Sequence, residues 1–344
     1  MAPSTAAAIP IIDLAGDQAD VARQLVAAAQ DHGFIYIRNL GDDVTPRDID
    51  QAFALSRKLF DAPAEEKQKC AIQNNRGWAG MHVEALDPKN QKARAFNFGE
   101  FVDGRAQQPL PSSIANEEQL LSAFADSCRR LCHKILSLLG QGLDVGDFFS
   151  SAHFVRQSGS GTILRFLRYP SAESTAHSSQ DIRAGAHSDY GSITLLFRLK
   201  GQAGLEILKK DSTWAPVPVC PPGTDTDPSP PILVNIGDLL SYWTNGLFRS
   251  TVHRVVFPTA GSGSVDGESS SGTRYSIAFF CHPEDSSRLE PVPSQRVQRY
   301  VPDGDGPDQN PYSQRQVLTA REHLEMRLKE SYATSLVSEE ATSA

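Results

Sequence analysis

From about residue 150 onward the chain consists of short apolar runs, rich in β-branched and aromatic residues, separated by clusters of Gly, Pro, Asp and Ser. Repeated short strands with turn signals between them are typical of a β-sandwich or a β-barrel. The separators at residues 221–231 and 260–273 predict surface loops. The expected strands lie at residues 162–169, 187–199, 205–208, 232–236, 251–257 and 274–281.

The first part of the chain combines short strands with amphipathic helices, so the predicted fold class is mainly β with flanking helices. Residues 116–140 predict a long helix with a buried stripe formed by Leu121, Phe124, Cys128, Leu131, Ile135 and Leu138. Residues 70–112 are polar and irregular, which is typical of a binding loop or lid. Further strands are expected at 9–14 and 34–38, and further helices at 17–32, 45–62 and 313–331.

Residues at the ends of these segments give the helix boundaries. Gly33 predicts the end of one helix, and Thr45 followed by Pro46 predicts the N-cap and first turn of the next. Ser313 and Gln316 have the spacing of a capping box for the last helix. The final dozen residues are expected to be disordered.

Charge and cysteine content exclude several classes of protein. A net charge of −8 over 344 residues, without a basic cluster, argues against a nucleic-acid binder. Five cysteines without a Cys-x-x-Cys pair indicate reduced thiols, and Cys128 and Cys132 are expected to be neighbours in the core or at the surface. No apolar run approaches about 18 residues and the N-terminus has no signal-like region, so we expect a cytoplasmic protein without a membrane partner.

The stretch Gly185–Phe197 carries the most specific candidate chemistry. His187 and Asp189 lie two residues apart, so on an extended chain both would point to the same face. We therefore expect them to bind one metal ion from a single strand, with His253 as the third ligand from another strand. Two histidines and one carboxylate form the facial triad of non-haem Fe(II) sites, which leaves coordination positions open.

Other histidines are alternatives to this trio. His82 with Glu84, and His282 with Glu284, have the same spacing as His187 with Asp189. The first pair lies in the loop region, and the proline between the members of the second disfavours strand pairing, so neither is expected to bind metal. The remaining histidines are expected to be ordinary surface or core residues, namely His32, His133, His153, His177 and His323.

Arg274 and Ser276 form a second constellation. On a strand these two side chains share one face with Ala278 and Phe280. A guanidinium and a hydroxyl on one face suit a carboxylate, which accepts a bidentate contact from arginine and one further hydrogen bond. A metal triad beside a carboxylate cradle would suit a substrate or co-substrate that chelates the metal and carries a distant acid group.

With these motifs the chain resembles the isopenicillin N synthase-like branch of the Fe(II)/2-oxoglutarate-dependent oxygenases. The resemblance covers almost everything from Ile9 to Tyr332. It rests on Pro10–Leu14, Gly33–Tyr36, Asn75–Gly77, His187–Leu196, Val234–Asp238, Thr244–Gly246, Ser250–Val255, Arg274–Ser276 and Phe279–Phe280, in that order.

The resemblance implies a double-stranded β-helix, or jelly-roll, core. It implies an N-terminal helix and strand region at 1–115, the core with its long and C-terminal helices at 116–333, and a tail at 334–344. It also implies Fe(II) at His187, Asp189 and His253, with 2-oxoglutarate and O2 as co-substrates. Arg274 and Ser276 would bind 2-oxoglutarate.

Tyr169 matches a tyrosine that hydrogen-bonds the same co-substrate carboxylate in this family. Plant relatives often have asparagine two residues earlier; Leu167 at that position predicts a more apolar wall. Strand alternation places Arg165 on the face of Tyr169, where we expect it to favour an acidic or carbonyl-rich substrate. Further substrate-pocket candidates are Phe280, Tyr190 and, in the lid region, Arg76.

The expected activity is oxidation of a small molecule by hydroxylation, desaturation, cyclisation or ring expansion, in specialised metabolism. One alternative is an oxidase like isopenicillin N synthase, which uses O2 without 2-oxoglutarate. The other is a non-catalytic small-molecule receptor on the same fold. We expect a monomer or weak homodimer, and the substrate itself is not identified by the sequence.

Overall fold

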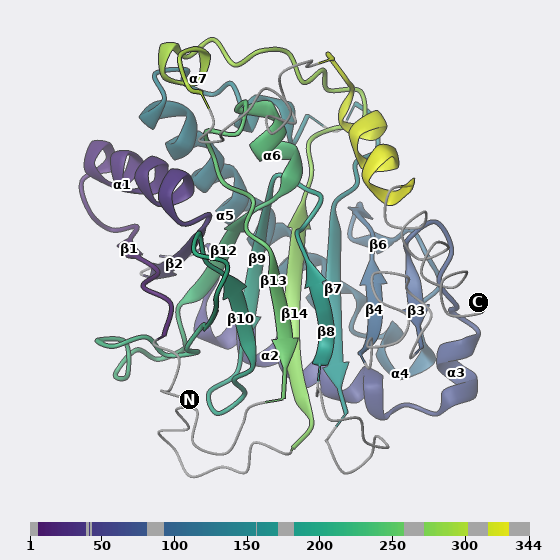
Figure 1. The fold of residues 1–344 in the computed structure, drawn as a ribbon. Helices are drawn as coiled ribbons and strands as arrows, with labels where there is room; N and C mark the ends of the chain where they lie inside the picture. The colour runs from purple at the N-terminus through teal and green to yellow at the C-terminus, as the bar shows by residue number, and fades with distance from the viewer. Residues whose placement is uncertain are drawn as a thin grey trace, which may run out of the picture.

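The computed structural model describes residues 6–38, 41, 43–80, 93–155, 157–170, 182–257, 272–301 and 316–329. Its centre is formed by two sheets (Figure 1). The eight-stranded sheet contains, in spatial order, β1 (Ile11–Asp13), β2 (Phe34–Arg38), β12 (Ile232–Ile236), β9 (Ile193–Arg198), β14 (Arg274–Cys281), β7 (Ile163–Tyr169), β4 (Arg94–Phe98) and β3 (Gly77–Ala79). The four-stranded sheet contains β11 (Trp214–Pro216), β10 (Leu205–Leu208), β13 (His253–Val256) and β8 (Ile182–His187).

The sheets lie face to face, with the four-stranded sheet in front of the larger one in Figure 1. Neighbouring strands are antiparallel except β1 and β2, which are parallel at one edge. Pro10 directly precedes that edge strand, where a missing N–H is tolerated. One buried apolar cluster lies between the sheets and includes Leu167, Tyr169, Leu205, Val255 and Ala278. This arrangement is the predicted double-stranded β-helix.

Helices cover the outer face of the large sheet. α1 (Gln18–Asp31) packs beside α5 (Glu118–Gly142), and the predicted apolar stripe of α5 is buried throughout, whereas His133 is exposed. α2 (Pro46–Asp61) begins with the predicted cap, since Thr45 and Asp48 form a complete capping box. Gly33 ends α1 with φ +68°, as its left-handed conformation requires. The second, larger core lies between these helices and the sheet.

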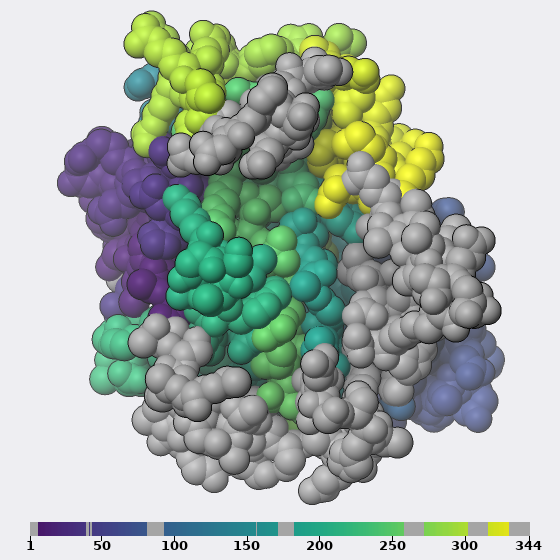
Figure 2. Space-filling view, in the orientation of Figure 1, coloured from purple at the N-terminus to yellow at the C-terminus, as the bar shows by residue number. Residues whose placement is uncertain are grey.

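Short elements connect these parts. They are α3 (Ala64–Gln68), β5 (Phe101–Val102), β6 (Arg105–Ala106), α4 (Ser112–Ala115), a 3-10 turn at Ser150–Ala152, α6 (Asp238–Trp243) and α7 (Gln295–Gln298). Figure 2 shows one face of the molecule, where the yellow helix 320–329 lies at the upper right.

Three expectations about secondary structure are wrong. Residues 70–112 are not one irregular loop, because β3 and β4 extend the large sheet within them. Residues 187–199 are not one strand: His187 ends β8, and β9 begins only at Ile193. The last helix begins at 320 rather than at 313, because Thr319 and Glu322 form its capping box through reciprocal side-chain hydrogen bonds.

The five cysteines all lie in the described part of the chain. All five cysteines are free thiols, and Cys128 and Cys132 lie in the helical core rather than at the surface. None of the helices in the described ranges combines the length and apolar character needed to cross a bilayer. His82, Glu84, His177, Ser313 and the tail 334–344 lie outside the described residues, as does most of the loop at 260–273.

Candidate metal centre

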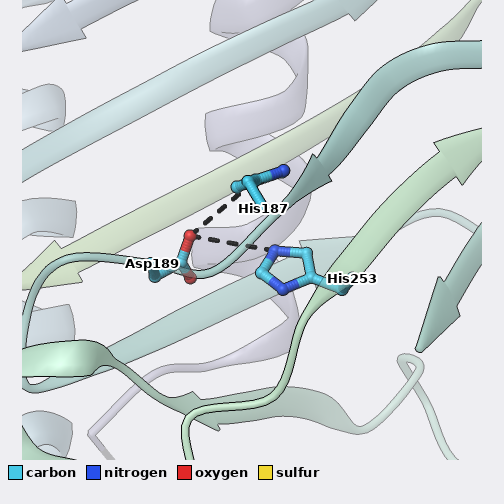
Figure 3. A group of neighbouring side chains, drawn as sticks. All are labelled: His187, Asp189 and His253. Atoms are coloured by element: carbon cyan, nitrogen blue, oxygen red, sulfur yellow. Dashed lines mark ion pairs between the residues drawn. The ribbon is translucent and has the colours of Figure 1, made fainter. Parts of the chain in front are cut away.

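His187, Asp189 and His253 meet at one end of the sandwich. His187 is the last residue of β8 and pairs in register with His253, the first residue of β13. Asp189 lies just beyond β8, in the connection to β9, so His187 and Asp189 do not lie on a single strand as the sequence suggested. One ligand atom from each residue lies within 4.8 Å of the others, and no other such group occurs among the described residues. Figure 3 shows the three side chains converging.

The trio is arranged around one oxygen of Asp189. Its Oδ1 lies 3.9 Å from Nε2 of His187 and 3.8 Å from Nε2 of His253. Its Oδ2 accepts hydrogen bonds from Thr194 Oγ1 at 2.6 Å and from Asn235 Nδ2 at 2.7 Å. Because Oδ2 is engaged by these two donors, Oδ1 is the oxygen presented to the shared space.

Backbone carbonyls orient both imidazoles. Nδ1 of His187 lies 2.8 Å from the carbonyl oxygen of Gly185, and Nδ1 of His253 lies 3.2 Å from that of Thr251. A carbonyl only accepts, so Nδ1 carries the proton in each ring and the Nε2 lone pair faces the trio. The ring of Phe34 packs edge-on against His253, with centroids 5.5 Å apart.

The protonation states suit a divalent cation. Burial, together with the neighbouring His253, lowers the pKa of His187 to about 4, so its ring is neutral at pH 7. Burial alone would raise the pKa of Asp189, but the two histidines and the donors Thr194 and Asn235 lower it overall. A neutral imidazole and a carboxylate are the forms that bind metal.

Arg274 and Ser276 lie buried on β14, with exposed fractions of 2% and 1%. Arg274 pairs in register with Tyr169 on β7, and its guanidinium carbon lies 5.0 Å from the tyrosine ring centroid. Its Nη1 lies 3.4 Å from Ser276 Oγ, and its Nε donates to the carbonyl of Gln202 at 3.2 Å. No carboxylate of the described residues forms an ion pair with Arg274, so a buried guanidinium is available to an acidic ligand.

The interior between the cradle and the trio is largely apolar. Leu167 lies opposite Ser276 in register, which supports the apolar wall expected there. Phe280 pairs with Thr194, the residue that holds Asp189, and is packed against the cluster between the sheets. Arg274 therefore lies at one end of β14, and Phe280 lies near its other end, on the side of the trio.

The other substrate candidates differ in position. Arg165 pairs with Ala278 and lies close enough to His187 to help lower its pKa. Tyr190 directly follows Asp189, and its ring centroid lies 5.5 Å from the guanidinium of Arg327 on helix 320–329. The described contacts of Arg76 are different: its side chain lies against Gly99, and its charge partly offsets the burial that raises the pKa of Asp285.

His282 and Glu284 do not join the trio. Burial, followed by the charges of His323 and His153, lowers the pKa of His282 to about 3. Glu284 instead accepts a hydrogen bond from the backbone of Ser158 at 2.7 Å.

Sequence reasoning missed several residues that support the trio. Thr194 and Asn235 hold Asp189, and Asp238 joins the segments of both histidines. A signal was present for Asn235, which is a polar residue inside the otherwise apolar strand 232–236. Nothing local marked Thr194, because threonine is common in strands.

Sequence profiles of two families match the chain. The 2OG-Fe(II) oxygenase superfamily matches residues 160–283, and the family described as "non-haem dioxygenase in morphine synthesis N-terminal" matches residues 9–122. The first match contains the trio and the Arg274–Ser276 pair. The second covers the N-terminal helices and strands.

Similar proteins cover nearly the whole chain. UPF0676 protein C1494.01 of Schizosaccharomyces pombe is 32% identical, over 95% of this chain and 94% of that protein. The 2-oxoglutarate-dependent dioxygenase frbA of Dothideomycetidae sp. is 29% identical, over 90% of each chain. The crystal structure of a full-length Neurospora crassa protein in complex with alpha-KG and thymine superimposes with a TM-score of 0.75 at 27% identity, covering 94% of this chain and 97% of that chain.

Proposed function

The chain belongs to the 2OG-Fe(II) oxygenase superfamily, and from that premise we propose that His187, Asp189 and His253 are the ligands of its Fe(II). The protein is an Fe(II)- and 2-oxoglutarate-dependent oxygenase that uses O2 to oxidise a small molecule. The observation that carries the metal assignment is the convergence of two Nε2 atoms on Oδ1 of Asp189. Three protein ligands leave positions open for the reactants.

Arg274, Ser276 and Tyr169 are proposed to bind the distal carboxylate of 2-oxoglutarate. The support is the buried guanidinium, which the described residues leave without a carboxylate, beside a serine hydroxyl and a tyrosine ring. Bound iron and 2-oxoglutarate supply the oxidising chemistry, in which the co-substrate is converted to succinate and CO2. The chain's part is to hold the reactants in a fixed orientation and to exclude water with the apolar interior.

Arg165, Tyr190 and Phe280 are proposed to contact the substrate, with Arg76 as a more distant candidate. Arg165 is the informative one, because a guanidinium near His187 would favour an acidic or carbonyl-rich molecule. The solved Neurospora crassa complex holds thymine, which is carbonyl-rich, and other relatives are named proline hydroxylase and homoarginine-6-hydroxylase. Arg165→Ala should therefore raise substrate KM or change the product pattern; unchanged values for both would remove Arg165 from the pocket.

The test of the function has two parts. Protein reconstituted with Fe(II) under nitrogen should hold one iron per chain, and His187→Ala should lose it. With a panel of candidate metabolites, turnover should release succinate from 2-oxoglutarate. Product formation without succinate would favour the oxidase alternative, and a protein that binds ligand without iron would favour the receptor.

Assembly, location and domain division remain part of the proposal. A monomer or weak homodimer in the cytoplasm agrees with the acidic charge and the five free thiols. The division into 1–115, 116–333 and a tail describes positions along the chain rather than separate folding units. Strands from the first part share the large sheet with strands of the second. Sedimentation velocity would test the oligomeric state, and fractionation of cells would test the location.

A further inference from the structure

Arg183 is a buried arginine on β8, and the sequence predicted no role for it. Only 2% of it is exposed, and its guanidinium carbon lies 4.1 Å from the ring centroid of Phe257. Its Nη2 donates to the carbonyl oxygen of Gly272 at 2.9 Å, whereas its Nε has no hydrogen-bond partner among the described residues. A buried guanidinium with an unused donor is costly unless a ligand completes its contacts.

Arg183 lies near the residues of the proposed co-substrate cradle. Gly272, which accepts its hydrogen bond, is two residues before Arg274 on the chain. β8 belongs to the small sheet and β14 to the large one, so the two arginines approach the interior from opposite sheets. Burial, followed by the charge of Arg274, lowers the pKa of Arg183 to about 10, and Tyr169 acts on it in the opposite direction.

A third arginine increases the local positive charge. Arg198 pairs in register with Ser276, is 4% exposed, and its charge contributes to the lowered pKa of Arg274. Its Nη1 donates to the carbonyl of Val217, while Nε and Nη2 have no partner in the described ranges. The described carboxylates form no ion pair with Arg183, Arg198 or Arg274, so within the described ranges these three cations lack an acidic partner that an anionic ligand would supply.

We propose that Arg183 is a second guanidinium anchor for the distal carboxylate of 2-oxoglutarate, acting from the sheet opposite Arg274. This inference rests on the proposed function, because it assumes that Arg274 and Ser276 form the co-substrate cradle. It goes further in assigning the selectivity of the pocket to two arginines. The pocket is then specific for 2-oxo acids that carry a second carboxylate, and it discriminates against 2-oxo acids with an apolar tail.

The experiment compares two ligands that differ only at that end. Protein loaded with Fe(II) under nitrogen is titrated with 2-oxoglutarate and with 2-oxopentanoate, and binding is followed by the visible charge-transfer band of the chelate and by calorimetry. Arg183→Gln should weaken 2-oxoglutarate binding about tenfold, the effect of losing one charge-assisted hydrogen bond. Binding of 2-oxopentanoate should not change, because it has no distal carboxylate.

Arg129→Gln is the matched control. Arg129 also lies over an aromatic ring, that of Phe154 at 5.6 Å, and its side chain is only 14% exposed. It lies on α5 and pairs with Asp126, so its loss should leave the binding of both ligands unchanged.

A second variant tests the inference independently of the folding of Arg183→Gln. With two anchors, Arg274→Gln should keep part of the preference for 2-oxoglutarate over 2-oxopentanoate; complete loss of that preference would show Arg274 to be the sole anchor. Equal weakening of both ligands by Arg183→Gln, or no weakening, would also overturn the inference while the proposed function stands. A wild-type protein without any preference for 2-oxoglutarate would instead refute the cradle itself.

Discussion

Arg327 on helix 320–329 contacts Oδ2 of Asp238 with two nitrogens, Nε at 3.0 Å and Nη2 at 2.9 Å. The same carboxylate accepts hydrogen bonds from Ser188 at 2.9 Å and Ser250 at 2.6 Å. Ser188 stands between His187 and Asp189, and Ser250 precedes His253 by three residues. Asp238 thus joins the C-terminal helix to both segments that carry the trio.

Replacing this carboxylate should loosen the proposed metal site. We expect Asp238→Asn to weaken Fe(II) binding about tenfold, the lower end of the effect of losing a direct partner of a metal ligand, because Asp238 acts on the ligands through Ser188 and Ser250. Arg327→Met should have a smaller effect of the same kind. Competition with a colorimetric chelator under nitrogen measures the affinity.

Arg321→Gln is the control for that prediction. Arg321 lies on the same helix, but its side chain is 65% exposed and pairs with Asp285 and Glu325 at the surface. An iron affinity as low in Arg321→Gln as in Asp238→Asn would show that helix stability, not the Asp238 contacts, is responsible.

Thr194→Val should also lower iron affinity about tenfold. The substitution keeps the size of the side chain but removes one of the two donors that hold Oδ2 of Asp189, so the carboxylate can rotate. Thr213→Val removes an equal hydrogen bond of 2.6 Å, to the exposed Asp211, and should leave iron binding unchanged. Equal iron affinities for wild type and Thr194→Val would mean that Asn235 alone orients the carboxylate.

The protein should lose stability in mild acid. Burial is the main cause that lowers the pKa of His153 to about 4, of His282 to about 3 and of His323 to about 4. Unfolded histidines titrate near 6.5, so below that pH the unfolded chain binds more protons than the folded one. Stability is therefore complete above about pH 6.5 and decreases as the pH falls toward 4.

Melting temperatures between pH 8 and pH 5 measure this loss, and His323→Leu should make it smaller. Nδ1 of His323 has no hydrogen-bond partner among the described residues, so leucine removes a titrating group without breaking a hydrogen bond of that atom. The same acid slope in His323→Leu and wild type would contradict the assignment.

Gly33→Ala should destabilise the fold by about 1–3 kcal/mol from backbone strain alone, since φ is +68° there. A Cβ would also lie 2.1 Å from the carbonyl oxygen of Arg249, which is backbone and cannot move aside easily. Denaturant unfolding measures the loss. Gly41→Ala has a similar φ of +63° in open space, so the difference between the two variants isolates the steric part.

Local signals predicted the regular elements well. The cap at Thr45 and Pro46 places the start of α2. β14 has the expected bounds at 274 and 281, because alternate residues of this strand face the interior and give a clear sequence pattern. β4 was missed because Asn97 suggests a loop. Its Nδ2 donates hydrogen bonds to Asn75, which lies 22 residues away and whose position only the folded chain reveals.

The candidate site was predictable as a set of residues but not as a geometry. The His187 and Asp189 motif, His253 and the Arg274–Ser276 pair are visible in the sequence, and the family resemblance orders them. The position of Asp189 beyond the end of β8 depends on the pairing of β8 with β13, which contains register shifts near His253. The contact between Arg327 and Asp238 spans 89 residues, so no local pattern could indicate it.

The hydrogen bonds from His187 and His253 end on the carbonyl oxygens of Gly185 and Thr251, which belong to the main chain. A point substitution exchanges a side chain and leaves these oxygens in place. The orientation of both rings therefore depends on the path of the backbone rather than on the side chain at either position. Homologues can therefore differ widely in the side chains around this centre, and in the substrate that they accept, while the two imidazoles keep their orientation.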